Sequence, residues 1–414
     1  MNDLLARAAA NWPVRPFLRD RKGVMTFAEV ENQVGALAET IRRGADQQVV
    51  VVPAVDSRSV IELLAVQRAG ATAVVLSARW PEALARRLVA KAAADRRPVQ
   101  TVLFTSGTSS GHPNGVRLST SNWDAAAAAS VASLGHGPGD RWLCPLPLHH
   151  AGGLAIVYRC LLAGGEMFLA PDHERLERWI GRVEFASLVP TQLRRLLLPA
   201  GTRFDSRARV LVGGGPVDSG VLDQAASAGL VPLPTYGMTE TASQLTTARP
   251  SDPDRRMFPL EGIEVRIGDD ERIEVRGPTV FRGYLGEEER RDADWFTTPD
   301  RGRVNADGSL TVTGRADRVI LTGGEKVDPV EVESAIGTLP GVEEVVVFAL
   351  GDRDWGEAVA AVYVGSIDPA EIAGRLGAYL PRHALPKHWR RVAALARNEL
   401  GKIDMVAVIA EFDR

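Results

Sequence analysis

Short apolar runs alternate with helical patterns between residues 49 and 232, and this alternation limits the possible folds more than any other feature of the chain. Strands typically have four to eight residues, and the apolar runs fall within that length. The runs are VVVVPAV at 49–55, ATAVVL at 71–76, TVLF at 101–104, EMFLA at 166–170, FASLV at 185–189 and ARVLVGG at 208–214. Strands that alternate with helices predict βαβ units, with helices covering both faces of parallel sheets.

The pattern changes after about residue 260. The segments IEVRI, RIEVRG and SLTVTG alternate apolar and polar residues, and the turn signals GDD and ADG separate them, which predicts a small antiparallel sheet or barrel. A compact α+β tail follows, in which Asp328 caps a helix that has Pro329 in its first turn. We therefore predict an α/β fold with a large N-terminal domain over 1–315 and a small C-terminal domain over 318–414.

The composition indicates an ordinary soluble globular protein. The chain has 414 residues, of which 45% are hydrophobic and 24% charged, and its net charge of −3 gives no basic footprint for nucleic acid. It contains no apolar run of 18 residues for a membrane span and no signal-peptide pattern at its start. Cys144 and Cys160 cannot form a disulfide framework, so we expect both to be buried apolar side chains. A cytoplasmic location and small-molecule partners follow as expectations.

The segment TSGTSSGHPNG at 105–115 is rich in glycine and hydroxyl side chains. Such a segment is either a plain surface loop or a cradle of backbone N–H groups for phosphate. It does not match the Walker A pattern, because His112 stands where the second glycine is required. This segment and GGGP at 213–216 each follow a predicted strand and precede a predicted helix. Ligands of α/β sheets bind at that carboxyl edge.

Four further segments carry weak chemical signals. They are YGMTETASQ at 236–244, WFTTPDRG at 295–302, GRADRVILTGGEKVDPVEVE at 314–333 and RNELGKID at 397–404. Thr239 and Glu240 could offer a hydroxyl to phosphate and a carboxylate to Mg²⁺. Asp300 is expected in a loop, where a carboxylate can hold a ribose, and Lys402 would by default be a surface lysine.

Taken in this order, the five segments resemble the adenylate-forming superfamily of acyl-CoA synthetases, nonribosomal-peptide adenylation domains and luciferases. The resemblance spans about 100–404, and it implies a C-terminal domain that rotates about a hinge. Two positions depart from the family pattern. Asn114 replaces a lysine in a loop that is one residue longer, and Pro299 stands where glycine is common.

The resemblance implies an ATP site in the first domain. The β,γ-phosphates would be held by Thr105, Ser106, Gly107, Thr108, Ser109, Ser110 and Gly111. Tyr236, followed by Gly237, would cover adenine beside the backbone of Gly213, Gly214 and Gly215. Thr239 would contact the α-phosphate, and Glu240 would bind Mg²⁺.

The resemblance assigns other functions near and beyond the domain boundary. Asp300 and Arg315 would bind the ribose. Asp317 matches the hinge, and Lys402 matches a lysine that serves the first half-reaction, in which a carboxylate attacks ATP to form an acyl-adenylate. The second half-reaction transfers the acyl group to CoA, and Gly323 with Gly324 would let the backbone approach the pantetheine arm.

Within the superfamily, PLPLHHAGGLAIV at 145–157, LVGGGPV at 211–217 and YGMTETASQ resemble the o-succinylbenzoate–CoA ligases of menaquinone biosynthesis. His150 matches a histidine that borders the acyl pocket, although a histidine in an apolar segment is more often a core residue. Arg159 and Arg194 are candidates for the second carboxylate of this substrate by charge alone. The alternatives are another aryl- or acyl-CoA ligase, or a nucleotide-binding homologue without catalysis. A homodimer is compatible with the sequence, which does not determine the oligomeric state.

Overall fold

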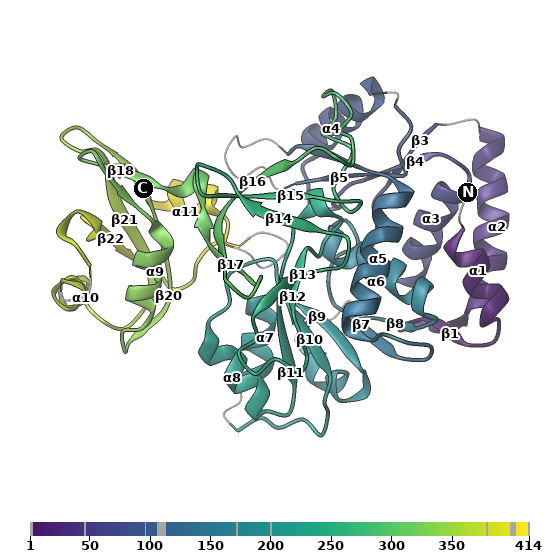
Figure 1. The fold of residues 1–414 in the computed structure, drawn as a ribbon, viewed down its shortest axis with the longest axis horizontal. Coiled ribbons are helices and arrows are strands. Elements are labelled where there is room, and N and C mark those ends of the chain that lie inside the picture. Colours follow the sequence, from purple (N-terminus) through teal and green to yellow (C-terminus); the bar gives the residue numbers. More distant parts are fainter. Residues whose placement is uncertain are drawn as a thin grey trace. The chain divides into compact units, whose positions relative to one another are not determined.

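The computed structural model describes residues 3–44, 47–95, 97–105, 113–170, 173–198, 201–377, 380–397 and 403–412 (Figure 1). Two compact units form. The first comprises residues 1–265, 275–296 and 305–310, and the second comprises 266–274, 297–304 and 311–414. The domain boundary expected near 315–318 stays a prediction.

The first unit contains helices α1 to α8 and parallel strands (Figure 1). Its helices are α1 (Leu4–Asn11), α2 (Phe27–Gly44), α3 (Ser57–Arg68), α4 (Glu82–Ala94), α5 (Thr120–Leu134), α6 (Ala151–Ala163), α7 (Pro190–Leu197) and α8 (Ser219–Ser227), with 3₁₀ turns η1 (His173–Arg178), η2 (Ile180–Arg182) and η3 (Thr239–Thr241). Its strands are β1 (Pro16–Asp20), β2 (Gly23–Thr26), β3 (Gln48–Val51), β4 (Thr72–Val75), β5 (Thr101–Phe104), β6 (Gly115–Leu118), β7 (Arg141–Cys144), β8 (Glu166–Leu169), β9 (Phe185–Leu188), β10 (Arg209–Val212), β11 (Val231–Tyr236), β12 (Thr246–Ala248) and β13 (Met257–Pro259).

The six predicted apolar runs all form strands of this unit. One sheet includes the consecutive strands β13-β12-β11-β10-β9-β7-β8-β1-β2, and a second has the order β3-β4-β5-β6. Strand β10 pairs in parallel with both β9 and β11, and β4 pairs in parallel with β3 and β5. Every residue of β4, β5, β8 and β9 is buried, which is typical of parallel strands with both faces covered. The predicted α/β class is confirmed.

Helix packing forms the core around these sheets. The helix α5 lies against α6, where the rings of Trp123 and Tyr158 stack with their centres 4.9 Å apart. Helices α7 and α8 lie beside β9, β10 and β11 (Figure 1), and their apolar side chains share one core cluster with β9 and β10. Cys144 and Cys160 are buried free cysteines, as predicted. None of the helices in the described ranges is long and apolar enough to cross a bilayer.

Four strands, β14 (Glu264–Ile267), β15 (Arg272–Arg276), β16 (Phe296–Val304) and β17 (Leu310–Arg315), are neighbours in this order, and the two units share their residues. The second unit continues with η4 (Ala316–Arg318), β18 (Ile320–Thr322), β19 (Glu325–Val327), α9 (Pro329–Gly337), β20 (Val342–Asp352), β21 (Gly356–Gly365), α10 (Pro369–Leu376), η5 (Arg382–Ala384), β22 (His388–Arg391) and α11 (Met405–Phe412).

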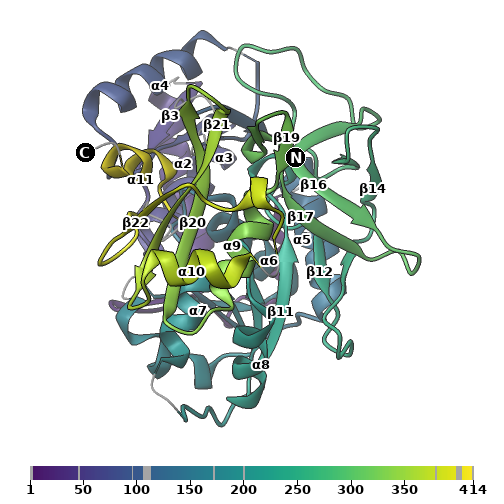
Figure 2. The same ribbon diagram turned by 90° about the vertical axis from the view of Figure 1, so that its left-hand side faces the viewer.

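The C-terminal sheet has the order β19-β18-β21-β20, and β22 pairs with β21 (Figure 2). Adjacent residues of β20 enter different core clusters: Val347 packs with α9 and α10, whereas Val346 packs with α11. This alternation follows from the two-residue period of a strand. The predicted cap of α9 is confirmed, because the Asp328 side chain accepts a hydrogen bond from the Val330 amide and Pro329 begins the helix.

Candidate nucleotide and acyl site

The adjacent carboxyl ends of β10 and β11 bring two predicted nucleotide segments together. The parallel register pairs Val212 with Pro234, so Gly213, which follows β10, and Tyr236, the last residue of β11, lie at one edge of the sheet. A Cβ on Gly213 would lie 2.8 Å from the Thr235 Cγ2 and 2.9 Å from the Thr235 carbonyl oxygen. Only glycine allows the backbone at position 213 to lie this close to Thr235, and the turn therefore stays at the edge of the sheet. The two following residues, Gly214 and Gly215, are exposed.

The segment after Tyr236 folds into a tight turn that contains η3. A Cβ on Gly237 would lie 1.7 Å from the Ser243 carbonyl oxygen, so this position requires glycine. Ala242 and Ser243 have φ angles of 50° and 96°, which non-glycine residues rarely adopt. Strain of this kind concentrates at functional sites. The turn presents Thr239 and Glu240, both half-buried.

Tyr284 contacts the predicted metal ligand and was not anticipated from the sequence. Its hydroxyl donates a 2.8 Å hydrogen bond to the Glu240 Oε1. Burial and the charge of Glu240 raise the pKa of Tyr284 above its ordinary value of 10, so the phenol keeps its proton and acts as the donor. The local signal was a tyrosine between glycines in GYLG at 283–286, but the contact joins residues 44 positions apart. We call residues 278–294 the tyrosine segment.

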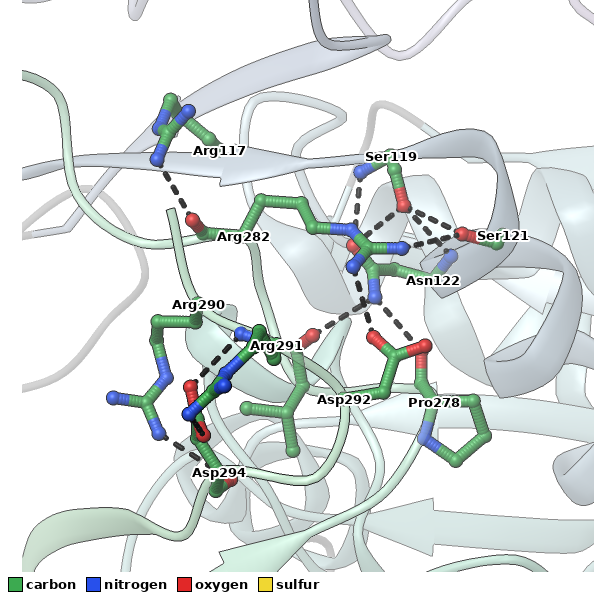
Figure 3. A network of polar contacts seen from close by, with 11 residues as sticks. Arg117, Ser119, Ser121, Asn122, Pro278, Arg282, Arg290, Arg291, Asp292 and Asp294 are labelled. Carbon is green, nitrogen blue, oxygen red and sulfur yellow. Dashed lines mark hydrogen bonds and ion pairs between the residues drawn. The ribbon is translucent and has the colours of Figure 1, made fainter. Parts of the chain in front are cut away.

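Within the first unit, a buried asparagine and a buried arginine bond to the backbone of the tyrosine segment (Figure 3). The Asn122 Nδ2 donates hydrogen bonds of 2.7 Å to the Pro278 carbonyl and 2.8 Å to the Val280 carbonyl. The Arg117 Nη2 donates a 2.7 Å bond to the Arg282 carbonyl. Asn122 and Arg117 are 0% and 1% exposed, so water does not compete for these bonds.

Asn122 owes its orientation to the start of α5. The Asn122 Oδ1 accepts a 2.9 Å hydrogen bond from the Ser119 amide, and the Ser119 hydroxyl accepts one of 3.2 Å from the Asn122 amide. This reciprocal capping box fixes the side chain, whose Nδ2 is then directed at the tyrosine segment (Figure 3).

The glycine- and hydroxyl-rich segment at 105–115 connects two antiparallel strands. Phe104 pairs with Gly115, and the Thr105 amide donates a 3.0 Å hydrogen bond to the Asn114 carbonyl. The expectation that this segment enters a helix was wrong, because β6 intervenes and α5 begins at Thr120. The strand β6 pairs with β5, and the Arg117 amide bonds to the distant Gly283 carbonyl; a local pattern reveals neither interaction. The predicted phosphate ligands Ser106, Gly107, Thr108, Ser109, Ser110 and Gly111 lie outside the described residues.

The candidate acyl-pocket residues differ in burial. His150 is half-buried at the start of α6, and its ring centre lies 4.3 Å from that of His149. Arg194 on α7 is exposed, whereas Arg159 on α6 is 2% exposed.

Arg159 is a buried cation within an apolar helix. Its Nη2 lies 3.5 Å from the Ser243 Oγ, and its guanidinium carbon lies 5.2 Å from the ring centre of Trp142. Burial lowers the pKa of Arg159 to about 10, which still leaves the group charged at neutral pH. Among the ion pairs between described residues, none includes Arg159. A buried charge of this kind is costly unless an anion offsets it.

The remaining predicted residues belong to the second unit. Asp300 lies in β16, so its expected place in a loop was wrong. Proline and aspartate at 299–300 read as turn residues, yet β15 and β17 flank the strand and override that local preference. Arg315 ends β17 and is half-buried. Asp317 lies within η4, and Lys402 lies outside the described residues.

Gly323 and Gly324 form the turn between β18 and β19 with φ angles of 58° and 86°, which favour glycine. A Cβ on Gly323 would also lie 2.6 Å from the Trp355 ring. These two glycines therefore have a structural reason for their identity, and their proposed approach to pantetheine stays a prediction.

The residues present suit Mg²⁺ bound together with a nucleotide. The described part of the chain holds no group of three or more His, Cys, Asp or Glu side chains placed for a metal. Mg²⁺ commonly binds through one or two carboxylates together with substrate phosphates and water. The half-buried Glu240 carboxylate is consistent with such a site.

Two segments of the chain match family models. Residues 90–285 match the AMP-binding enzyme family, and residues 331–402 match the AMP-binding enzyme C-terminal domain. A 2-succinylbenzoate–CoA ligase from Listeria monocytogenes is 34% identical over 321 residues, covering 73% of this chain and 68% of the relative. A Mycobacterium tuberculosis protein named "Probable 2-succinylbenzoate–CoA ligase" is 36% identical over 335 residues, covering 76% of this chain and 85% of the relative.

A solved structure is similar over nearly the whole chain. It is the o-succinylbenzoate CoA synthetase of Bacillus subtilis in complex with the acyl-adenylate intermediate. The TM-score is 0.87 at 25% identity, and the match covers 97% of each chain.

Proposed function

Since the chain belongs to the AMP-binding enzyme family, we propose that it is an AMP-forming acid–thiol ligase that acts on o-succinylbenzoate. In the first half-reaction a substrate carboxylate oxygen attacks the α-phosphorus of ATP, and pyrophosphate leaves. In the second, the CoA sulfur attacks the acyl carbon of the adenylate. A thioester forms, the thiol proton is released, and AMP leaves.

The edge of β10 and β11 supports the nucleotide assignment. Gly213 lies directly against Thr235, the residue before Tyr236, and Tyr236 would cover the adenine. Thr239 would offer its hydroxyl to the α-phosphate, where charge develops during attack. Thr105 and the six residues after it would surround the β,γ-phosphates.

Glu240 would hold Mg²⁺ beside the phosphates. When bound, the ion would neutralise phosphate charge that develops as pyrophosphate leaves. Glu240 lies half-buried in η3, and its carboxylate accepts the hydrogen bond of Tyr284.

In the second unit, Asp300 and Arg315 would bind the ribose. Lys402 would offset negative charge during adenylate formation. Asp317 would serve as the hinge between the two half-reactions, and Gly323 with Gly324 would border the pantetheine arm. A homodimer stays a prediction.

The observation that carries the substrate assignment is the buried Arg159. o-Succinylbenzoate has two carboxylates, of which one reacts and the other needs recognition. A guanidinium within a largely apolar site binds carboxylate through charge-assisted hydrogen bonds. Arg159 fits this need because it is buried and has no acidic partner among the described residues, whereas Arg194 is exposed. Two relatives that are 34% and 36% identical carry the same substrate in their names.

A purified-enzyme assay tests the proposal. The protein is incubated with ATP, Mg²⁺, CoA and one acid at a time, and both AMP release and ATP–pyrophosphate exchange are measured. We expect o-succinylbenzoate to give the highest turnover. Faster turnover with benzoate or a medium-chain fatty acid would assign another acid to the same chemistry. ATP binding without turnover of any acid would favour the non-catalytic alternative.

A further inference from the structure

We propose that Tyr284 is a positioning residue for the metal-binding carboxylate, fixing Glu240 before Mg²⁺ and ATP bind. This inference rests on the proposed role of Glu240. The primary observation is the 2.8 Å hydrogen bond from the Tyr284 hydroxyl to the Glu240 Oε1. Groups that bond to a metal ligand set its orientation and its affinity for the ion.

The backbone of the tyrosine segment is fixed to the strand that leaves the glycine- and hydroxyl-rich loop. Tyr284 forms an antiparallel bridge with Val116 of β6. The Arg117 amide donates a 3.1 Å bond to the Gly283 carbonyl, and the Leu285 amide donates a 2.8 Å bond to the Gly115 carbonyl. These bonds flank Tyr284 on both sides and fix the backbone position from which its side chain extends.

Close packing strengthens this attachment. A Cβ on Gly115 would lie 2.3 Å from the Leu285 Cδ1, so the glycine allows the tyrosine segment to lie directly on β6. Beyond Leu285, the Gly286 amide donates a 3.0 Å bond to the Asp95 carboxylate. The side chain of Asp95 is 3% exposed and also pairs with Arg97.

The Tyr284 ring and the Glu240 backbone share a neighbour. The ring of Phe281 meets that of Tyr284 edge-on, with centres 4.8 Å apart, and the Phe281 amide donates a 2.8 Å bond to the Glu240 carbonyl. The same segment therefore holds both the main chain and the carboxylate of Glu240. Two independent attachments restrict the side chain more than the hydroxyl contact alone.

This arrangement connects the proposed binding sites for the ATP phosphates and for Mg²⁺. The strand β6 begins where the proposed phosphate loop ends, and the tyrosine segment joins that strand to the proposed metal ligand. A phenol suits this position because its neutral donor orients the carboxylate and leaves the negative charge for Mg²⁺. An arginine would orient the same oxygen but would neutralise the charge.

The test measures ATP binding by calorimetry on the full chain, without any acid, so that no adenylate forms. Each variant is titrated with ATP once in Mg²⁺ and once in EDTA. The Kd in EDTA divided by the Kd in Mg²⁺ is the metal enhancement. Tyr284→Phe keeps the ring but removes the donor. We expect the metal enhancement to fall about ten-fold, with the Kd in EDTA nearly unchanged.

A double-mutant cycle with Glu240→Gln separates positioning from general damage. If Tyr284 acts through Glu240, then Tyr284→Phe has no further effect on the metal enhancement in the Glu240→Gln background. Tyr363→Phe is the matched control, because the Tyr363 hydroxyl donates a 2.7 Å bond to the Ile367 carbonyl in the C-terminal sheet region. It should leave the metal enhancement unchanged, and thermal unfolding of each variant without ligand checks that the fold is intact.

Three outcomes overturn the inference. A normal metal enhancement in Tyr284→Phe, alongside its loss in Glu240→Gln, would show that the hydroxyl does not act on the metal site. Equal weakening in Mg²⁺ and EDTA would indicate general damage to the nucleotide site. An additive loss in the double variant would show that Tyr284 acts independently of Glu240. Failure of the unaltered protein to bind ATP would instead refute the proposed function itself.

Discussion

The guanidinium carbon of Arg159 lies 5.2 Å from the ring centre of Trp142, so a buried cation sits beside an aromatic face. A cation–π contact provides part of the stabilisation that a buried charge needs. It does not replace a carboxylate partner, which the proposed substrate would supply.

Arg159→Gln should therefore raise the KM for o-succinylbenzoate by at least about 30-fold, because a charge-assisted pair contributes roughly 2 kcal/mol or more. The KM for the matched monoacid that keeps only the reacting carboxylate (4-oxo-4-phenylbutanoate if the succinyl carboxylate reacts, 2-butyrylbenzoate if the aryl carboxylate reacts) should change little. Arg194→Gln is the control, since that side chain is exposed. Steady-state AMP release with both acids checks this expectation. Equal losses for the two acids would make Arg159 a structural residue.

Gly237→Ala should disrupt the turn that carries Thr239 and Glu240. The added Cβ would meet the Ser243 carbonyl at 1.7 Å, so the backbone must move. We expect kcat/KM for ATP to fall at least about 100-fold, because small displacements at a reacting centre are costly. Gly181→Ala is the matched control, since its Cβ would meet nothing within 4 Å. Wild-type ATP kinetics in Gly237→Ala would exclude this turn from the site.

His136 should make the stability of the fold depend on pH. Burial, and next the charge of Arg159, lower the pKa of His136 from 6.5 to about 4. The unfolded chain then binds more protons than the folded chain between these values, so the free energy of unfolding rises with pH across this window. As the pH falls from 6.5 towards 4, the free energy of unfolding therefore decreases progressively, and His136 contributes at most about 3 kcal/mol to this decrease.

His136→Phe should flatten that part of the pH profile, because phenylalanine has no group that titrates. The neighbouring rings of Trp142 and Phe185 form an aromatic environment that suits the new side chain. Urea unfolding at a series of pH values, on both proteins, gives the difference. A parallel pair of profiles would assign the acid sensitivity to other groups.

The segment at 105–115 should bind phosphate mainly through backbone amides and hydroxyls. Asn114→Lys should then lower the KM for ATP by no more than about five-fold, because an exposed lysine adds at most about 1 kcal/mol. Gly107→Val should reduce kcat/KM for ATP by at least about 100-fold by restricting and crowding the loop. ATP kinetics measure both effects. A rescue of orders of magnitude by Asn114→Lys would mean that the natural loop is degenerate.

Lys402→Ala should remove most adenylate formation but leave thioester formation from a supplied acyl-adenylate nearly intact. The reason is the domain rotation implied by the family, which would remove Lys402 before the second step. Pyrophosphate exchange and single-turnover thioester formation measure the two half-reactions separately. Similar losses in both would contradict this division.

Local sequence was sufficient where the deciding interactions were local. The apolar run ARVLVGG at 208–214 specified the buried strand β10, and Asp328 with Pro329 specified the start of α9. The motif YGMTETASQ, through its resemblance to known segments, identified Thr239 and Glu240 as candidates. Its fold depends on Gly237, whose lack of a side chain is itself a sequence property.

Tertiary structure decided the features that depend on distant partners. Strand β6 exists because it pairs with β5 and with the tyrosine segment, and Asp300 lies in a strand because β15 and β17 flank β16. The contact between Tyr284 and Glu240 requires the tyrosine segment to be held by Asn122 and Arg117. Periodicity and turn preference report only on neighbours along the chain, so the sequence determined the strands, caps and motif residues, whereas packing and pairing between remote segments determined which side chains meet.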